Sequence, residues 1–343
     1  MEAIEAGAII VIIAIFLIVV FFVCWWKKKK RKKGEGKTKA ADSDGPPFVR
    51  FSAEEISNAL NYTCPWAFLG EGSTGKVYKG KLPRGQFVAI KHISKDITQD
   101  DAFEMKIETL SKIEHKNLVS LLGYCEENGE KYIVYEYCAN GNLSQILLGL
   151  EDKVLTWEQR VKIAYDSVVG LRFLHLCPDG CIVHRNIKPT NILVTESMEA
   201  KLADFGLLAV FKIEKTRGSI DVKETMGYVD PQYYMQGRLT CSSDIYSFGM
   251  VLLQLLSGRA IDLYHFHRKS LVKEAQKVIQ TKPINLSKYA DSRLNGEYSR
   301  EAFEILLKLA VCCTTPSYGG RPRLLEVYEE IERAMEISSS ISF

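Results

Sequence analysis

The sequence predicts a two-lobed α+β domain that follows a single membrane-spanning helix. Three observations lead to this prediction. A run of twenty uncharged residues lies near the N-terminus, strand-like segments with glycine-rich turns follow up to about residue 137, and helical periodicity dominates from residue 141 onward. The chain has 343 residues, which exceeds one ordinary core and suits a membrane segment plus a bilobal unit of about 280–300 residues.

The apolar run at 7–26 is long enough to cross a bilayer, because twenty helical residues span about 30 Å. It ends in two tryptophans, and seven consecutive Lys or Arg residues follow at 27–33. A secretory signal peptide would carry basic residues before its apolar run, whereas two glutamates precede this one. We therefore expect a single-pass helix at the plasma membrane, with an extracellular stub at 1–6 and the rest of the chain in the cytosol.

The basic run at 27–33 explains the net charge of +3, since without it the chain has a small acidic excess. A basic face for nucleic acid is therefore not expected. The run, Lys27 to Lys33, is expected to attract anionic inner-leaflet lipid at about 1 kcal/mol per residue, while a plain stop-transfer signal is the alternative. Cys24 is a candidate for acylation, with an unmodified thiol as the default. The nine cysteines, without paired CxxC motifs, predict reduced thiols rather than disulfides or a zinc site.

The remaining chain divides into four predicted parts after the tether. Residues 27–50 are predicted to form a basic juxtamembrane tether, because glycine, proline and serine without periodicity mark a flexible segment. Ser52 and Glu55 form a capping box that starts a short helix ending near Leu60. The predicted parts are a helical segment at 51–65, a β-rich lobe at 66–138, a helical lobe at 139–337 and a tail at 338–343.

Within the two lobes, the periodicity predicts the individual elements. Strand-like runs lie at 68–80 (around a glycine turn), 87–93, 119–125 and 131–137. Helical stretches lie at 102–113, 142–150, 157–176, 242–258, 299–313 and 323–337.

A glycine-rich hairpin is predicted at GEGSTG, with Gly70, Gly72 and Gly75, followed by Val77. Glycine triplets often mark only a turn, and a dinucleotide-binding fingerprint would open into a helix, whereas strand-like residues flank this one. Sixteen residues after Gly75, the strand VAIK ends in Lys91. An exposed strand end is the plainer interpretation, but at this distance from the hairpin the lysine can reach the phosphates of a nucleotide.

A second group of polar residues lies in HRNIKPTN at 184–191 and in DFG, which begins at Asp204. Asn191 and Asp204 offer the hard oxygen ligands that suit Mg²⁺ on nucleotide phosphates. The ordered set of motifs makes a chance occurrence negligible, so ATP and Mg²⁺ are the expected cofactors.

With these motifs in place, residues from about 51 to 337 resemble the protein-kinase domain of plant receptor-like kinases, the branch that includes animal Pelle and interleukin-receptor-associated kinases. The resemblance is carried by HKNLVSLLGYC, IVYEYCANGNL, GYVDPQYY, SSDIYSFGMVLLQLLSG and GGRPRL. It implies that Asn186, Lys188, Asn191 and Asp204 occupy the catalytic positions.

The resemblance also implies roles for residues around the nucleotide. Tyr135 would be the gatekeeper and the backbone of Glu136 and Cys138 would meet adenine. Val77, Ala89 and Leu193 would enclose the purine. Asp244 would anchor the catalytic loop, and Leu110, Leu121, Phe205 and His184 would stack as a regulatory spine.

The first of three departures from the family pattern is Asn186, which stands where the resemblance implies a catalytic aspartate. A carboxamide can orient a substrate hydroxyl but has negligible basicity, so it cannot take the proton. Because positioned acid–base groups contribute roughly 10²–10⁴-fold, a loss of about this size is expected.

The second departure is Lys106, which stands where the family has a glutamate paired with the strand lysine. Like charges within a few ångströms in a low-dielectric cleft cost a few kcal/mol. Glu108 cannot substitute, because two residues along a helix turn through about 200°. We expect the helix to be swung outward and Lys91 to pair with Asp204 instead.

The third departure is Gln232, where the family has a glutamate paired with a buried arginine, here Arg321. Losing one partner of a buried pair costs about 3–5 kcal/mol, although the glutamine carbonyl can recover one hydrogen bond. Glu224 also replaces a small residue just before Thr225, at the wall that receives the peptide substrate.

These departures predict a pseudokinase that regulates or scaffolds a partner receptor kinase or a cytosolic signalling protein. One alternative is an active but weak ATP-dependent Ser/Thr kinase, in which the departures are tolerated. Another is a lipid-recruited adaptor, in which 27–33 is the functional part and the fold is passive. Thr216, Ser219 and Thr225 are candidates to accept phosphate from a partner.

Overall fold

The computed structural model divides the chain into two compact units, Met1–Pro46 and Pro47–Phe343. It describes residues 48–63, 65–72, 74–94, 100–149, 154–178, 180–205, 227–237, 240–261 and 268–340. Among these described residues, no helix combines the length and apolarity needed to cross a bilayer. The predicted span at 7–26, the basic run at 27–33, Glu224 and the candidate phosphate acceptors Thr216, Ser219 and Thr225 lie outside the described residues.

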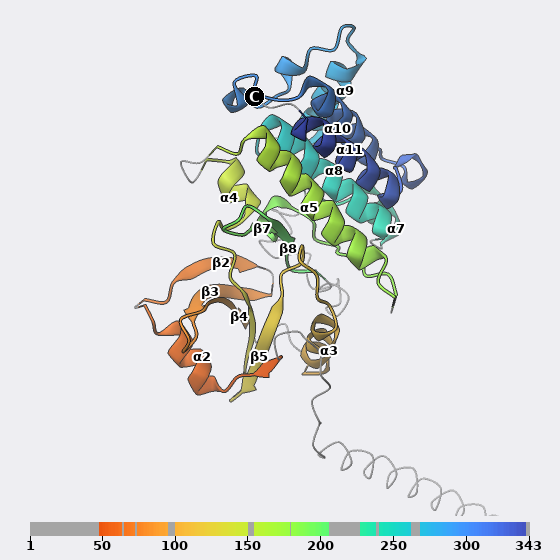
Figure 1. The fold of residues 1–343 in the computed structure, drawn as a ribbon. Helices are drawn as coiled ribbons and strands as arrows, with labels where there is room; N and C mark the ends of the chain where they lie inside the picture. The colour runs from red at the N-terminus through yellow and green to blue at the C-terminus, as the bar shows by residue number, and fades with distance from the viewer. Residues whose placement is uncertain are drawn as a thin grey trace, which may run out of the picture. The chain divides into compact units, whose positions relative to one another are not determined.

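The first lobe of the second unit is a six-stranded sheet with the strand order β1-β5-β6-β4-β3-β2 (Figure 1). Its neighbouring strands are antiparallel except for β1, which pairs in parallel with β5. The four predicted strand-like runs are confirmed. The strands are β1 (Val49–Arg50), β2 (Phe68–Gly72), β3 (Gly75–Lys81), β4 (Phe87–Ile93), β5 (Leu121–Glu127) and β6 (Glu130–Glu136).

Strand β1 corrects the predicted end of the tether, since Val49 and Arg50 belong to the sheet rather than to a flexible segment. Val49 lies opposite Gly123 of β5. A Cβ atom at Gly123 would come within 2.0 Å of the carbonyl oxygen of Val49. The glycine therefore permits the close parallel pairing, and two residues are too few for a period-2 pattern to show in the sequence.

Two helices cover opposite faces of the sheet (Figure 1). Alternate residues of β4 point to opposite sides, so each helix packs against a different set of them. Helix α2 (Ala53–Leu60) begins with the predicted capping box, in which Ser52 Oγ accepts from Glu55 N at 3.2 Å. Its buried side chains share a cluster with Val88 and Ile90. Helix α3 (Asp100–Ser111) packs against the other face, and its anchoring residues are described with the site below.

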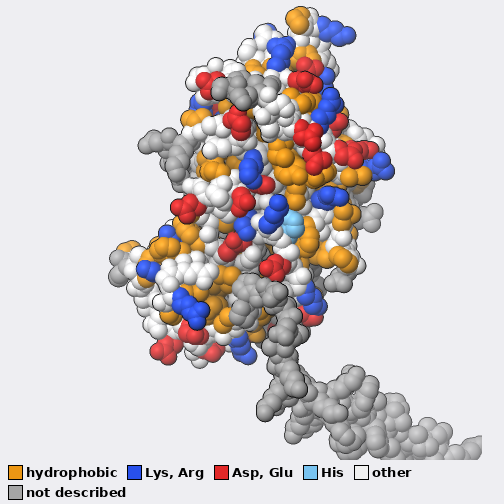
Figure 2. Space-filling model, in the orientation of Figure 1, with side chains coloured by type: hydrophobic (Ala, Val, Ile, Leu, Met, Phe, Trp, Pro, Cys, Tyr) orange, Lys and Arg blue, Asp and Glu red, His pale blue; other side chains and the backbone are white. Residues whose placement is uncertain are grey.

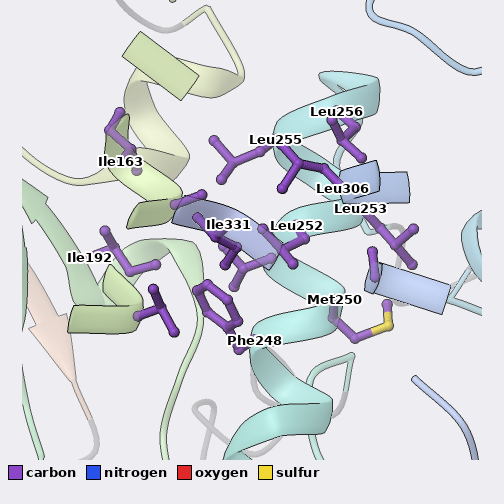
Figure 3. Packing of buried hydrophobic residues seen from close by; sticks show 14 of the residues in the cluster. Ile163, Ile192, Phe248, Met250, Leu252, Leu253, Leu255, Leu256, Leu306 and Ile331 are labelled. Carbon is purple, nitrogen blue, oxygen red and sulfur yellow. The ribbon is translucent and has the colours of Figure 1, made fainter. Parts of the chain in front are cut away.

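The second lobe is helical around one large core. Helix α8 lies at its centre, almost entirely buried, and Phe248, Leu252 and Ile331 converge there (Figure 3). A Cβ atom at Gly249 would lie 2.5 Å from Cys313 Cβ, so glycine allows α8 and α10 to approach closely. The helices are α4 (Leu143–Leu147), α5 (Trp157–His175), α7 (Pro231–Gln236), α8 (Cys241–Ser257), α9 (Arg268–Gln280), α10 (Arg300–Cys313) and α11 (Leu324–Ser339), with a hairpin of β7 (Ile192–Val194) and β8 (Ala200–Leu202).

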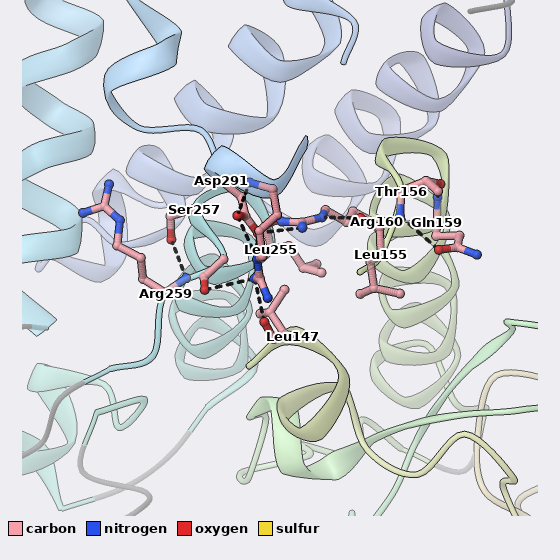
Figure 4. A network of polar contacts seen from close by, with 11 residues as sticks. Leu147, Leu155, Thr156, Gln159, Arg160, Leu255, Ser257, Arg259 and Asp291 are labelled. Atoms are coloured by element: carbon pink, nitrogen blue, oxygen red, sulfur yellow. Dashed lines mark hydrogen bonds and ion pairs between the residues drawn. The ribbon is translucent and has the colours of Figure 1, made fainter. Parts of the chain in front are cut away.

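A buried ion pair between Arg160 and Asp291 ties α5 to the segment after α9 (Figure 4). Arg160 Nη2 lies 2.6 Å from Asp291 Oδ2, and Nη1 donates to the carbonyl of Leu255 at 2.7 Å. Burial alone would raise the pKa of Asp291, but hydrogen bonds from Arg293 and Arg160 outweigh it and lower the pKa to about 2. The pair therefore stays ionised at physiological pH and joins three elements of the core.

On the face drawn in Figure 2, acidic and basic side chains are interspersed over the helical lobe. Interspersed charges of both signs are typical of a solvated surface.

The structure contradicts the predicted loss of a partner for Arg321. Asp230, the N-cap of α7, accepts from Arg321 Nη1 at 2.8 Å and from Nη2 at 2.7 Å, and both side chains are fully buried. The remaining three N–H groups of the guanidinium donate to the carbonyls of Thr315, Ser242 and Pro316. All five donors are satisfied, so the acid two residues before Gln232 does what a glutamate at 232 would do.

We predict that replacing Asp230, but not Gln232, destabilises the second unit strongly. Asp230→Asn leaves a buried guanidinium without its counter-charge and is expected to lower the free energy of unfolding by about 3–5 kcal/mol. Gln232→Ala is the matched control and is expected to cost about 1 kcal/mol or less. Urea unfolding measures both, and equal losses in the two variants would contradict the assignment of Asp230 as the partner of Arg321.

Candidate active site

Strand β4 presents the nucleotide-facing side chains predicted from the sequence. In the sheet register, Lys91 lies between Val77 of β3 and Ile133 of β6, and Ala89 lies opposite Tyr135. Directly paired residues share a face, so Val77, Ala89 and Lys91 lie on the same side of the sheet. Val77 and Ala89 are only partly buried there, which leaves apolar surface of the kind that a purine needs.

The segment after β6 connects the two lobes and holds the residues predicted to meet adenine. Glu136 Oε1 accepts hydrogen bonds from the backbone N of Ser120 at 2.7 Å and from Lys201 Nζ at 2.9 Å. Burial raises the pKa of the Cys138 thiol to about 12, so this thiol stays protonated. The structure thus places Glu136 and Cys138 where the two lobes connect. Leu193 lies in β7 and is partly exposed. Their contact with a purine stays a prediction.

The glycine hairpin lies over the lysine of β4. Gly75 has φ of +144°, and a Cβ atom there would lie 1.9 Å from the carbonyl oxygen of His92, so no other residue fits without a shift of the backbone. A Cβ atom at Gly72 would lie 4.0 Å from Lys91 Nζ, while Gly70 has open space. The hairpin backbone therefore passes close to the Lys91 ammonium, in the arrangement that cradles phosphate groups.

The catalytic loop is anchored as predicted. Asp244 accepts from the backbone N of His184 at 2.7 Å and of Arg185 at 2.8 Å, and it also contacts His175 Nε2 at 2.8 Å. Arg185 has φ of +69°, a left-handed conformation that the two hydrogen bonds hold in place. The predicted role of Asp244 as the anchor of this loop is confirmed.

One direct contact of the predicted spine is present, and its other members lie in or against the large core. Leu110 and Phe205 are buried in the large core, with Leu121 packed against it. The His184 ring meets the Phe205 ring edge to face, with 6.2 Å between the centroids. These four side chains come from both lobes, and their stacking into one continuous spine stays a prediction.

Asn186 sits in the anchored loop where the family has its proton acceptor. Its backbone N donates to His184 Nδ1 at 3.3 Å, and its carbonyl oxygen accepts from Asn191 Nδ2 at 2.8 Å. The nitrogen of the Asn191 side chain thus helps to orient the loop. Lys188, two residues after Asn186, is buried. The loop keeps its shape, while the side chain at 186 remains a group of negligible basicity.

Lys91 is paired with Asp204, as predicted. Lys91 Nζ lies 2.7 Å from Asp204 Oδ1, and both side chains are largely buried. Burial alone would raise the pKa of Asp204, but the positive charges of Lys91 and Lys106 and the hydrogen bond from Lys91 lower it below its ordinary value. The carboxylate is therefore ionised and already engaged with a cation.

Lys106 corrects the predicted outward swing of its helix. The Lys106 side chain is 4% exposed, and its Nζ has no hydrogen-bond partner among the described residues. Phe103 and Ile107 hold α3 against the sheet by packing with Ile93 and Ile133, so the helix stays inward. Burial first, and then the charge of Lys91, lower the pKa of Lys106 to about 7. A lysine that can release its proton is tolerated where a fixed cation would be expelled.

The fold and the site define a protein kinase domain. The protein kinase domain family matches residues 66–319, and the chain belongs to this family. It is 40% identical over 292 residues to a probable leucine-rich repeat receptor-like protein kinase of Arabidopsis thaliana, covering 84% of this chain and 30% of the relative. It is also 36% identical over 293 residues to a proline-rich receptor-like protein kinase of the same plant, covering 84% and 45%. The domain is therefore of the plant receptor-like kinase type, and the chain spans less than half the length of these relatives.

Protein kinase domains in general bind ATP and Mg²⁺, and the two fit this site differently. The glycine hairpin and the buried lysines suit phosphate groups. The candidate metal ligands are Asp204 and Asn191. The Asp204 carboxylate already accepts a hydrogen bond from Lys91, and the Asn191 side chain is a neutral amide. A protonated Lys106 beside Asp204 would repel a divalent ion held there. The oxygen donors themselves suit Mg²⁺, but the added positive charge of Lys106 beside Asp204 makes this site a poor fit for a divalent cation.

Two side chains that hold the site were not predicted from the sequence. Lys201 has a usable signal, because it lies in a short strand directly before ADFG and pairs with Leu193 in the register. His175 has none, since its contact with Asp244 joins residues 69 positions apart. Long-range polar contacts of this kind follow from the fold and not from local pattern.

We predict that Lys106→Met stabilises the second unit in a pH-dependent way. Between about pH 7 and pH 10 the unfolded chain binds a proton at Lys106 that the folded chain does not, so folded stability rises with pH. The variant lacks this dependence. Its advantage in the free energy of unfolding should therefore be largest near pH 7 and should fall by about 1.4 kcal/mol per pH unit above it.

Urea unfolding of both proteins at pH 7 and pH 9 measures this difference. Lys112→Met, at an exposed position of the neighbouring helical surface, is the control and should show no pH-dependent change. A constant difference between Lys106→Met and the natural protein across this range would show that Lys106 is not a depressed, buried amine.

Proposed function

We propose that this chain is a receptor-like pseudokinase, which regulates or scaffolds a partner kinase and transfers little or no phosphate itself. The observation that carries the proposal is the Lys91–Asp204 pair at 2.7 Å with Lys106 buried beside it. In this arrangement the lysine that should clamp phosphates is engaged with the carboxylate that should hold metal.

The chemistry of phosphoryl transfer needs three functions that this site does not supply together. A base must accept the hydroxyl proton, and Asn186 offers only a carboxamide. A lysine must be held toward the phosphates by an anion, and the position that supplies this anion in the family holds Lys106. A carboxylate must be available to metal, and Asp204 Oδ1 accepts from Lys91. Together these deficits favour a loss of catalysis.

The rest of the domain supports a role that depends on a folded shape. The contact between the His184 and Phe205 rings and the anchoring of the catalytic loop by Asp244 support a domain that keeps its folded shape. The same features favour the alternative of a weak Ser/Thr kinase, since the backbone is in place and only side chains differ.

The proposal includes a location and a partner. The apolar run at 7–26 would anchor the chain in the plasma membrane, and the basic run at 27–33 would hold it against anionic lipid. A membrane anchor would concentrate the domain beside a receptor kinase in the same bilayer. Thr216, Ser219 and Thr225 would then be available to receive phosphate from that kinase.

A phosphotransfer assay on the purified chain tests the proposal. The natural chain is expected to label a peptide no faster than Asp204→Asn, which sets the background. Asn186→Asp combined with Lys106→Glu restores the base and the anion and is expected to be at least about 10²-fold faster than the natural chain.

Two outcomes would contradict the pseudokinase assignment. The first is labelling by the natural chain that is well above background and is abolished by Asp204→Asn. The second is a double variant no faster than the natural chain, which would show that these two positions do not limit the reaction.

A further inference from the structure

The cleft between the lobes contains a charge arrangement that the family pattern does not have. Asp204 experiences the positive charges of Lys91, Lys106 and Lys188. A glutamate at position 106 would balance one of these lysines, whereas Lys106 adds to them. Replacing an anion by a cation changes the local charge by up to two units at the place where phosphates and metal would meet.

Lys106 is the unsatisfied member of this group. Its side chain is 4% exposed, and its Nζ finds no hydrogen-bond partner within the described part of the chain. Buried ammonium groups require an anion or several hydrogen bonds, because transfer out of water is unfavourable without them. An anionic ligand in the cleft would supply the missing counter-charge, since the nearest protein carboxylate in the group is already bonded to Lys91.

The surroundings of this group favour a phosphate chain carrying a nucleoside. The glycine hairpin lies close to Lys91 Nζ, and its backbone suits phosphate oxygens. The partly exposed Val77 and Ala89 lie on the same face of the sheet as Lys91 and offer apolar surface for a base. These lysines offset part of the negative charge of a triphosphate, which is part of the service that Mg²⁺ gives elsewhere.

We propose that this cleft binds a nucleoside triphosphate without a divalent metal ion, with Lys106 taking the place of the metal's charge. The inference rests on the proposed function in one respect, because a cleft that catalyses transfer needs the metal. Its readout is binding rather than turnover. If metal-free binding is not found, the phosphotransfer result is unaffected. If the phosphotransfer assay contradicts the proposed function, the binding result is likewise unaffected.

Isothermal titration of the full chain in detergent micelles with ATP tests the proposal, once with EDTA and once with excess Mg²⁺. The natural chain is expected to bind ATP in EDTA at least as tightly as with Mg²⁺. Lys106→Glu should weaken binding in EDTA by about tenfold or more and make Mg²⁺ favourable. Lys106→Met removes the charge without adding one, should weaken metal-free binding several-fold, and keeps the test decisive if the glutamate variant does not fold.

Two controls complete the experiment. Lys112→Glu makes the same charge change at an exposed site of the same helical region and should leave the affinity in EDTA unchanged. Sodium tripolyphosphate replaces ATP to separate the nucleoside from the phosphates, and it should bind at least about tenfold more weakly.

Three results would overturn the proposal: ATP binding that requires Mg²⁺, no ATP binding in either buffer, or an affinity in EDTA that Lys106→Glu leaves unchanged. Tripolyphosphate binding as tight as ATP would overturn the assignment of a nucleoside ligand.

Discussion

One electrostatic constraint governs the site: two lysines and one aspartate share a cleft from which water is largely excluded. Lys91 and Asp204 satisfy each other at 2.7 Å, and Lys106 is left with positive charge nearby and no hydrogen-bond partner within the described residues. In the family arrangement the charges would alternate across the cleft. A glutamate on the helix would face the strand lysine, and that lysine would lie near the aspartate of DFG. A single change of sign on the helix therefore alters how every other charged group in the cleft is used.

The position of helix α3 shows which force dominates. Phe103 and Ile107 pack with Ile93 and Ile133, and burial of each such side chain contributes about 1.5–3 kcal/mol. Leu110 adds a contact with the core of the other lobe. The desolvation of one amine that can release its proton is of comparable size to one or two of these contacts. Packing prevails, the helix stays inward, and the cost appears as a lowered pKa.

The anchors around the cleft follow a different principle, in which buried charges are fully satisfied. Arg321 uses all five donors, and Asp244 accepts from two successive backbone N–H groups of the catalytic loop. Arg160 and Asp291 form a third such site. These groups are structural, and their complete pairing contrasts with Lys106, a buried amine without a hydrogen-bond partner among the described residues.

Much of this arrangement could be predicted from the sequence, because it depends on local pattern or on ordered motifs. The capping box of α2, the strand runs, the loop anchor at Asp244 and the Lys91–Asp204 pair were all predicted. The errors have physical causes. The prediction that α3 swings outward considered charge repulsion but left out the apolar contacts of the same helix. Asp230 was overlooked because its reach to Arg321 depends on how α7 starts, and α9 was not predicted at all.

The most direct measurement of the central claim is an NMR titration of isotope-labelled lysine side chains, with Lys106→Met used to assign the signal. One lysine is expected to titrate near pH 7 and to be missing from the variant. If every lysine of the natural chain titrates near its ordinary pKa of about 10.4, Lys106 is not a buried amine beside Lys91.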